Sequence, residues 1–467
     1  MRTALSSPFV VAAALLGLGL GLGLVACAGD ADHPAAVPVA PPPPPIASVA
    51  PPPVVTPAPT PTPTPTPAAA PASAPPGKLN VLLLTVDSLR ADMPWAGYER
   101  DIAPALTAFE KKAVSYTHAY SVSSYTAMSV AGLLAGRYPG ELERSGYFFS
   151  SYPDSVLMFP ELLQKAGVRT IAAHAHFYFD KQHAGFHQGF DVYEMVKGIT
   201  ADNKTDKNIT SPQHLELAER LLSDKANTAG TFFAWFHFMD PHDEYMPHEG
   251  FGPYGKSARD KYDAEVAFTD QHLGKLLAFV AQQPWAKDTV IIVSSDHGEA
   301  FKEHKMWRHG FELYEMLVRV PLMIQAPGIT PRRIDEARSG IDLAPTILEL
   351  TGTPPEPSFV GKSLVPELYG KAAEPRDVIV DLPRTSDNDR RRALIHGQYK
   401  LIAWGDDLNW EFFDIVADPA ESKDLKKSEK AAFEAMKARY KETVGKLHDR
   451  CPKHTDKLKG KNEHKRC

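Results

Sequence analysis

The sequence predicts an α/β domain built on a mainly parallel β-sheet with helices on both faces. Two observations indicate this class. Short apolar runs with the length of buried parallel strands recur along the chain, at residues 79–87, 168–174, 231–238 and 288–296. Stretches with helical patterning separate these runs, for example at residues 103–114 and 257–283. Such alternation is typical of sheets whose parallel strands are joined through helices.

The pattern changes after about residue 375. Residues 392–404 and 409–416 have the composition of two antiparallel strands, and residues 428–448 have that of a long amphipathic helix. We therefore expect a second, smaller unit packed on the first. The expected divisions are a large α/β domain at 78–374, a small α+β subdomain at 375–448 and a basic tail at 449–467.

Composition limits the classes of partner. The chain has 467 residues, a formal net charge of −6 and a pI near 6.3, so no electrostatic attraction to nucleic acid is expected. The cysteines are Cys27, Cys451 and Cys467, all distant in sequence from the polar motifs described below, which argues against a cysteine nucleophile. In an exported chain the last two could form a disulfide or stay reduced.

The N-terminus has the features of a targeting segment at residues 1–27. Arg2 precedes the apolar run 8–25, and the Leu-Val-Ala-Cys sequence ending at Cys27 resembles the bacterial lipoprotein signal. We expect export and lipid anchoring to a bacterial membrane, facing the periplasm or the cell surface; an ordinary secretory peptide or a membrane anchor is the alternative. Residues 28–77, rich in Pro, Ala and Thr, predict an extended tether.

Polar side chains gather where the predicted strands end. They are Asp87 after the first run, His237, Asp240 and His242 at the end of the third, and Asp296 and His297 after the fourth. Ligands bind at this edge of open α/β sheets, and carboxylates with imidazoles there suit a divalent metal. The alternative is that the acids cap helices and the histidines are buried and hydrogen-bonded.

Longer motifs around these residues resemble those of the sulfatase family, within the alkaline phosphatase superfamily. The matching segments are 82–92, 101–121, 133–139, 295–328, 341–352 and 397–425, within a resemblance that covers about residues 78–445. The resemblance implies a large α/β domain followed by a smaller C-terminal domain with an antiparallel sheet. It also implies an enzyme that hydrolyses phosphoric or sulfuric esters with one or two divalent metal ions.

The resemblance assigns metal-binding positions. They are Asp87, Asp296, His297 and Thr126. Separately from the resemblance, His237 and Asp240 at the end of the third run are candidates for a second ion. Ser88 stands where many sulfatases have a further Asp ligand, so that ligand is missing. Many sulfatases have Asn at the position of His297 and bind calcium; the imidazole favours zinc or manganese, with calcium as the alternative.

Thr126 stands where sulfatases carry the Cys or Ser that is oxidised to formylglycine. Ser129 of the family motif is kept, while Met128 and Val130 replace its Pro and Arg. Threonine cannot become formylglycine, but its metal-bound hydroxyl at a helix N-terminus can attack phosphorus. The alternative is that Thr126 only caps the helix that follows.

The remaining candidates face the substrate in the family pattern. The catalytic candidates besides Thr126 are His242 and His309, and the substrate-binding candidates are His174, His176 and Ser129. His242 and His309 could instead support a metal from a second layer of contacts. His174 and His176 could instead simply line a hydrated cleft.

These observations predict a metal-dependent hydrolase that cleaves a phosphate, phosphodiester or sulfate ester through Thr126. The substrate would be a small-molecule, glycan or lipid ester. One alternative is a transferase that passes a phosphoryl or phosphoalcohol group to a glycan or lipid. A second is a catalytically inactive surface-binding lipoprotein, which the departures at Ser88 and Val130 support. The sequence does not predict the oligomeric state.

Overall fold

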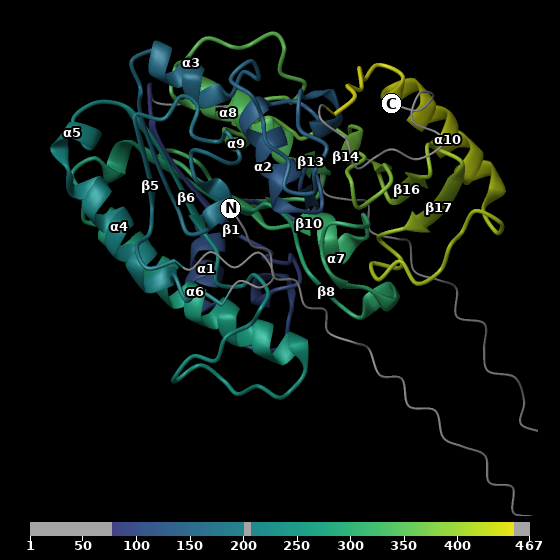
Figure 1. The fold of residues 1–467 in the computed structure, drawn as a ribbon, viewed down its shortest axis with the longest axis horizontal. Helices are drawn as coiled ribbons and strands as arrows, with labels where there is room; N and C mark the ends of the chain where they lie inside the picture. The colour runs from purple at the N-terminus through teal and green to yellow at the C-terminus, as the bar shows by residue number, and fades with distance from the viewer. Residues whose placement is uncertain (1–76, 200–206, 453–467) are drawn as a thin grey trace, which may run out of the picture. The chain divides into compact units, whose positions relative to one another are not determined.

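An eight-stranded sheet forms the centre of the computed structural model, which describes residues 77–199 and 207–452 (Figure 1). Its strand order is β12-β2-β11-β7-β1-β6-β4-β5. The strands are β1 Asn80–Val86, β2 Val114–Tyr116, β4 Arg169–His174, β5 Val192–Met195, β6 Phe232–Phe238, β7 Thr289–Ser295, β11 Leu322–Gln325 and β12 Arg332–Ile334. The four apolar runs are confirmed as strands β1, β4, β6 and β7.

The sheet is mainly parallel, as predicted. β1 pairs in parallel with both β6 and β7, and β4 pairs in parallel with β5 and β6. β11 is antiparallel to both of its neighbours, β7 and β2. A small three-stranded sheet is made of β3 Ala119–Tyr120, β10 Arg319–Val320 and β13 Arg338–Ser339, and a hairpin of β8 Ala300–Phe301 and β9 Trp307–Arg308.

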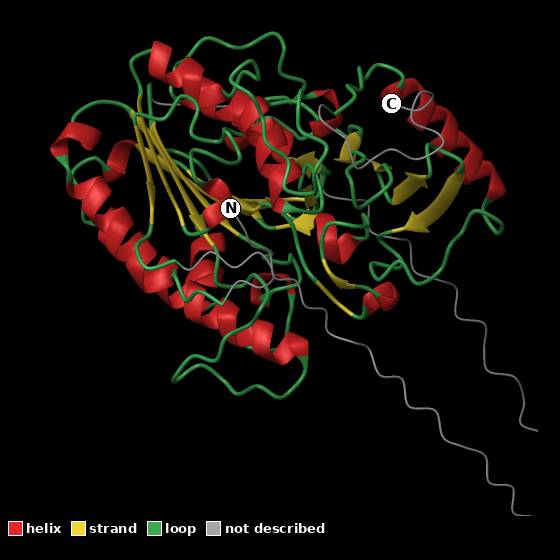
Figure 2. Cartoon of the chain, in the orientation of Figure 1, coloured by secondary structure: helices red, strands yellow, loops and turns green. Residues whose placement is uncertain are grey.

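Two apolar layers cover the large sheet because alternate residues of each strand face opposite sides. Leu83 of β1 packs with the layer of α2 Thr126–Ala135, α3 Phe159–Lys165, α8 Leu343–Leu350 and α9 Val365–Leu368. Leu84 packs with the layer of α1 Pro104–Glu110, α4 Ser211–Ser223 and α6 Ala258–Ala281. Figure 2 shows these helices on the two sides of the strands. Two shorter helices are α5 Lys225–Thr228 and α7 Glu315–Val318.

Helix α2 is held at both ends by its local sequence. Tyr125 precedes it in an extended conformation, and Gly136 ends it with φ 58°. A Cβ at Gly136 would lie 2.6 Å from the ring of Phe359, so both the left-handed backbone and the close ring require glycine. The helix therefore begins and ends at fixed points, which fixes the position of Thr126.

The C-terminal region contains four antiparallel strands, β14 Val378–Leu382, β15 Arg391–His396, β16 Tyr399–Trp404 and β17 Asn409–Asp414. The prediction of only two strands is wrong. Residues 392–404 turn back at Gly397, whose φ is 56°, and so form a hairpin, while β14 was not recognised. The predicted long helix is α10 Lys430–Val444, and its Phe433 and Tyr440 pack against the strands.

A buried ion cluster links the C-terminal sheet to the rest of the described chain. Lys400 of β16 is fully buried, and its Nζ lies 2.9 Å from Glu315 Oε1 and 3.0 Å from Glu421 Oε1. Glu315 belongs to α7. Three charges removed from water are tolerated only because they pair with one another. The cluster therefore fastens β16 to α7.

Several sequence predictions concern residues outside the described ranges. Among them are the targeting segment with Cys27, nearly all of the tether, and Cys467. Cys451 is described, and it is exposed and free. In residues 77–199 and 207–452, no helix has the length and apolar character needed to cross a bilayer.

Candidate active site

Three adjacent strands bring polar side chains together at their carboxyl ends. Asp87 directly follows β1, Asp296 directly follows β7, and His237 lies near the end of β6. All three are buried, and each offers one ligand atom within 4.8 Å of the others. Two carboxylates and an imidazole at this spacing form a candidate site for a divalent metal.

Thr126 is the first residue of α2, and its hydroxyl points to this cluster. The Oγ1 atom lies 3.1 Å from Asp87 Oδ2, to which it donates, and 3.1 Å from His297 Nε2. The N-cap position is occupied by Tyr125, and no side chain caps the helix. Thr126 is therefore not the N-cap of α2. Its hydroxyl contacts acids and imidazole across the site instead.

The imidazole of His297 has a defined orientation. Its Nδ1 lies 2.9 Å from the carbonyl oxygen of Gly298; a carbonyl can only accept, so Nδ1 carries the proton. Nε2 therefore presents a lone pair toward Thr126, 3.4 Å from Asp296 Oδ2. Burial, followed by the charge of His309, lowers the pKa of His297 to about 3. The ring is neutral, which is the form that ligates metals.

The two carboxylates fit a bound cation. Burial and the neighbouring charge of Asp87 raise the pKa of Asp296 to about 7. Its Oδ2 atom is buried and has no hydrogen-bond partner in the described chain. Buried polar atoms are normally satisfied, and a carboxylate pair is costly without a counter-charge. Asp87, Asp296 and His297 could therefore hold a divalent cation, for which the free Oδ2 atom and the Nε2 lone pair are suitable donors.

His309 lies beside this cluster as a cation. Its Nδ1 is 3.2 Å from Glu299 Oε1, and its ring centroid is 4.2 Å from that of His297. Although burial opposes it, the charge of Glu299 raises the pKa of His309 to about 9. The pKa of Glu299 is lowered in return, burial being outweighed by the charge of His309. A positive imidazole at this position can stabilise negative charge on a substrate.

Two further imidazole rings form a series of contacts with His309. The ring of His242 lies 5.1 Å from that of His309, and the ring of His176 lies 6.2 Å from that of His242. His176 also accepts a hydrogen bond from the backbone N–H of Tyr178. The structure thus brings three of the sequence candidates, His309, His242 and His176, into successive ring contact.

Other sequence candidates lie elsewhere. Asp240 accepts hydrogen bonds from Thr210 and the backbone N–H of Ser211 at the start of α4, so both of its oxygens are occupied. His174 is buried between Phe179 and Tyr193. Ser129 is buried within α2. His237, considered for a second ion, lies instead in the same cluster as Asp87 and Asp296.

Exposed aromatic residues lie close in sequence to the candidate residues: Phe177 directly follows His176, and Phe311 lies two residues after His309. We define the aromatic rim as Phe149, Phe177 and Phe311, whose exposed fractions are 56%, 38% and 42%. Phe148 connects the rim to the site: its ring stacks on Tyr125 at 4.4 Å and on Phe311 at 5.6 Å. Phe149 also contacts Phe148, at 5.5 Å. Apolar rings so close to Thr126 can contact the alcohol part of an ester.

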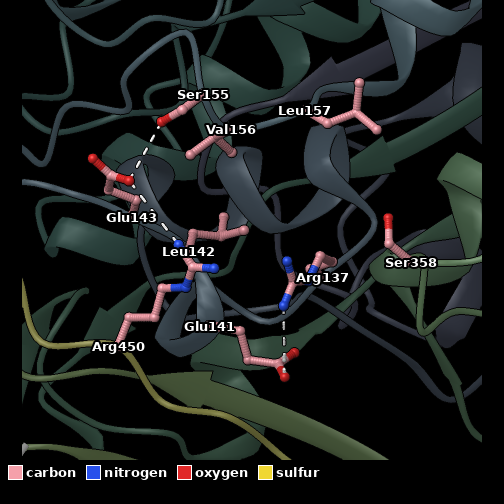
Figure 3. A pocket seen from close by; sticks show the side chains of 9 residues that line it. All are labelled: Arg137, Glu141, Leu142, Glu143, Ser155, Val156, Leu157, Ser358 and Arg450. Atoms are coloured by element: carbon pink, nitrogen blue, oxygen red, sulfur yellow. Dashed lines mark hydrogen bonds and ion pairs between the residues drawn. The ribbon is translucent and has the colours of Figure 1, made fainter.

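A separate pocket lies beyond the opposite end of α2 (Figure 3). It has a volume of about 110 Å³ and is lined by Arg137, Glu141, Leu142, Glu143, Ser155, Val156, Leu157, Ser358 and Arg450. Its charges largely satisfy one another: Arg137 lies 3.9 Å from Glu141, and Arg450 lies 4.0 Å from Glu143. None of the candidate site residues lines it.

Sequence reasoning missed three contributors to the site. Glu299 ends the Ser-Asp-His-Gly-Glu run, and nothing in that run predicts its pairing with His309. Thr85 and Trp235 have the pattern of ordinary strand residues, yet Thr85 contacts both His237 and Trp235. The only signal in the sequence was a polar Thr inside an otherwise apolar strand run.

The sequence matches the models of known protein families. The family model for sulfatases matches residues 79–353, more than half of the chain. The chain belongs to the sulfatase family. A model of the C-terminal part of N-sulphoglucosamine sulphohydrolase also matches, at residues 302–450. The chain is accordingly an ester hydrolase of this family with a buried candidate metal site.

Individual relatives are distant. The choline-sulfatase of Rhizobium meliloti is 24% identical over 427 residues, which cover 75% of this chain and 82% of that protein. Human arylsulfatase K is 30% identical over 177 residues, covering 36% of this chain and only 33% of its own length. The region shared with arylsulfatase K is thus one part of each protein.

Solved structures share the fold. The phosphonate monoester hydrolase of Agrobacterium radiobacter superposes with a TM-score of 0.64 at 16% identity, covering 79% of this chain and 95% of that one. A 2-O GAG sulfatase superposes with a TM-score of 0.64 at 19% identity, covering 79% and 93%. The sulfatase fold is therefore common to proteins named for phosphorus esters and for sulfur esters.

Proposed function

We propose that this sulfatase-family protein is a metal-dependent hydrolase in which Thr126 is the nucleophile. The observation that carries the proposal is the position of the Thr126 hydroxyl, 3.1 Å from both Asp87 Oδ2 and His297 Nε2. Thr126 donates its single proton to Asp87 Oδ2, which leaves the lone pairs of its oxygen for a cation and the substrate. A divalent cation held by Asp87, Asp296 and His297 would supply Lewis-acid activation of the hydroxyl and the ester.

The residues of this chain account for each stage of a two-step hydrolysis. The oxygen of Thr126 attacks the central phosphorus or sulfur, and the bond to the alcohol breaks. Cationic His309 stabilises the negative charge on the equatorial oxygens. We assign to His242, whose ring centroid lies 5.1 Å from that of His309, the donation of a proton to the departing alcohol. Water then attacks the same centre and gives one proton to His242. The bond to Thr126 breaks, and its oxygen recovers a proton from Asp87, to which it had donated.

The single hydroxyl of threonine favours phosphorus over sulfur. A formylglycine hydrate can expel sulfate with its second hydroxyl group, which threonine lacks. Release must then occur by attack of water on the central atom, which metal assistance makes easier at phosphorus. We therefore propose phosphate esters or phosphodiesters as the main substrates. Because some similar proteins are named as sulfatases, the assay below also includes a sulfate ester.

We further propose that the protein acts outside the cytoplasm. The signal-like segment ending at Cys27 supports lipid anchoring on the outer side of a bacterial membrane. The substrate would then be an ester available outside the cytoplasm, belonging to a small molecule, a glycan or a lipid. Globomycin treatment of expressing cells, which blocks lipoprotein signal cleavage, would leave a larger precursor if this is right and change nothing if it is not.

The test of the activity compares three aryl esters on one enzyme. The purified chain, loaded with Mn²⁺ or Zn²⁺, would be assayed on an aryl sulfate, an aryl phosphate and an aryl phosphodiester, each alongside Thr126→Ala. Turnover of a phosphorus ester that Thr126→Ala abolishes supports the proposal. Turnover retained in the variant contradicts it, and an added alcohol that captures the phosphoryl group would indicate a transferase.

A further inference from the structure

A buried chain of hydrogen bonds runs behind the candidate metal site. It starts at Trp235, whose indole Nε1–H donates to Thr85 Oγ1 at 2.8 Å. Thr85 Oγ1 lies 2.7 Å from Nδ1 of His237, the residue paired with it across β1 and β6. His237 Nε2 lies 3.3 Å from Asp87 Oδ2. All four side chains are at most 2% exposed.

The chain has a direction because its first member can only donate. An indole N–H has no acceptor function, so Thr85 Oγ1 must accept from Trp235. The Thr85 hydroxyl then needs an acceptor for its own proton, since a buried unpaired O–H is costly. In the described part of the protein the hydrogen-bond partner left for it is Nδ1 of His237. Thr85 therefore donates to Nδ1, and the ring proton of His237 resides on Nε2.

His297 has the opposite tautomer. Its Nδ1–H is fixed by the Gly298 carbonyl at 2.9 Å, which leaves the lone pair on Nε2. Both histidines direct Nε2 at the same carboxylate, since His297 Nε2 lies 3.6 Å from Asp87 Oδ1. One ring thus presents a proton to Asp87 and the other presents a lone pair to the site. The distances to Asp87 alone do not show which of the two histidines binds the cation. The hydrogen-bond partners of their Nδ1 atoms do, because they fix the two tautomers.

We propose that His237 is a positioning residue for Asp87 and not a metal ligand. Thr85 and Trp235 fix the tautomer of His237, so its Nε2–H holds Asp87 Oδ2 by a hydrogen bond. Asp87 Oδ1 accepts a hydrogen bond from the Ser88 hydroxyl at 2.9 Å and keeps its second lone pair for the cation. His297 is then the imidazole ligand of the site. This assignment rests on the proposed metal site, but it is distinct from the proposed role of Thr126.

The first test needs neither metal nor activity. In the metal-free protein with ¹⁵N-labelled histidine, long-range ¹H–¹⁵N NMR correlations report which ring nitrogen carries the proton, and His237→Gln assigns the signal. A proton on Nε2 of His237 is expected. A proton on Nδ1 would overturn the proposal, whatever the enzyme hydrolyses.

The second test counts nitrogen ligands in the loaded protein. Pulsed EPR of the Mn²⁺ form is expected to show coupling to one imidazole nitrogen, lost in His297→Gln and kept in His237→Gln. Coupling to two nitrogens, or loss in His237→Gln, would overturn the assignment. Absence of Mn²⁺ binding in the wild type would instead contradict the proposed metal-dependent function, so the two failures are distinguishable.

Thr85 provides a variant that preserves shape. Thr85→Val removes the hydroxyl without changing the volume much, whereas Thr85→Ser keeps it. Thr85→Val is expected to weaken Mn²⁺ binding about 10- to 100-fold, as loss of an outer contact to a ligand does, while Thr85→Ser stays within about threefold of wild type. Equal affinities in both variants would show that the hydrogen-bond chain does not position Asp87.

Discussion

The hydroxyl oxygen of Thr126 lies 3.1 Å from Nε2 of His297, and this contact joins the first turn of α2 to the end of β7. Because Nδ1–H of His297 is held by a backbone carbonyl, Nε2 can only accept or ligate. Since Thr126 donates its single proton to Asp87 Oδ2 at 3.1 Å, the Nε2 lone pair stays beside the hydroxyl oxygen, where both atoms can contact one cation. Thr126 does not cap the helix, because Tyr125 occupies the N-cap position.

Removing the charge of Asp296 should have opposite effects on the stability of the metal-free protein and on its affinity for the metal. Its carboxyl pKa is raised to about 7 by burial and by Asp87, so its charge destabilises the metal-free protein as the pH rises from about 4 through 7. Asp296→Asn is expected to raise the Tm of the EDTA-treated protein at pH 8 and to weaken Mn²⁺ or Zn²⁺ binding on the order of 100-fold or more. Calorimetric titration and thermal melts measure both. A lower Tm with unchanged metal affinity would contradict the placement of the ion.

The pairing of His309 with Glu299 predicts a pH dependence of stability. His309 has a folded pKa of about 9, above its ordinary value of 6.5. Its stabilisation is therefore complete below pH 6.5 and is lost as the pH rises through 9, a change of up to about 3 kcal/mol. In Glu299→Gln, EDTA-treated like the wild type, this loss between pH 6.5 and 9.5 should disappear from denaturant-unfolding curves. Parallel pH profiles for the two proteins would disprove the ion pair.

The aromatic rim should act on substrate binding more than on chemistry. Phe311→Ala removes a ring that stacks on Phe148 beside Tyr125. We expect a rise in KM for an aryl ester of about three- to tenfold, equivalent to about 1 kcal/mol of lost ring contact, with kcat changed less than twofold. A methyl ester, which has no ring to stack, should show little change. Tyr254→Ala is the control, since that exposed ring packs on Arg100 instead.

Lys400 should be critical for the C-terminal sheet. Lys400→Met leaves Glu315 and Glu421 buried without their cation, and removing one partner of a buried ion pair costs about 3–5 kcal/mol. The matched control is Lys426→Met, a half-exposed partner of Asp424, for which a loss below about 1 kcal/mol is expected. Urea-unfolding midpoints compare the two. Equal losses would show that the buried cluster contributes no more than a surface pair.

Local patterning predicted most of what positions the site. The apolar runs ending at Asp87, His237 and Asp296 are adjacent strands, and parallel strands place their carboxyl ends at one edge. That geometry alone brings the three side chains together. The position of Thr126 in the site came from the family resemblance. Thr126 begins helix α2, and the pattern of the strands does not predict that this helix starts beside Asp87.

What the sequence could not predict depends on contacts between distant residues. Asp240 was only a candidate for a second ion, and in the structure the N–H groups at the start of α4 hydrogen-bond to its carboxylate. The role of His237 depends on which atom of Thr85 faces it across two strands. The hairpin at Gly397 was missed because apolar residues continue on both sides of the turn and conceal it.

The central claim is that Thr126 becomes covalently attached to the group it releases. The most direct measurement is mass spectrometry of the metal-loaded enzyme quenched in acid during turnover of an aryl phosphate or phosphodiester, with digestion to locate the adduct. The account predicts a phosphorylated Thr126 that appears within the first turnover and is absent from Thr126→Ala. Steady turnover with Thr126 unmodified, or turnover that persists in Thr126→Ala, would contradict it.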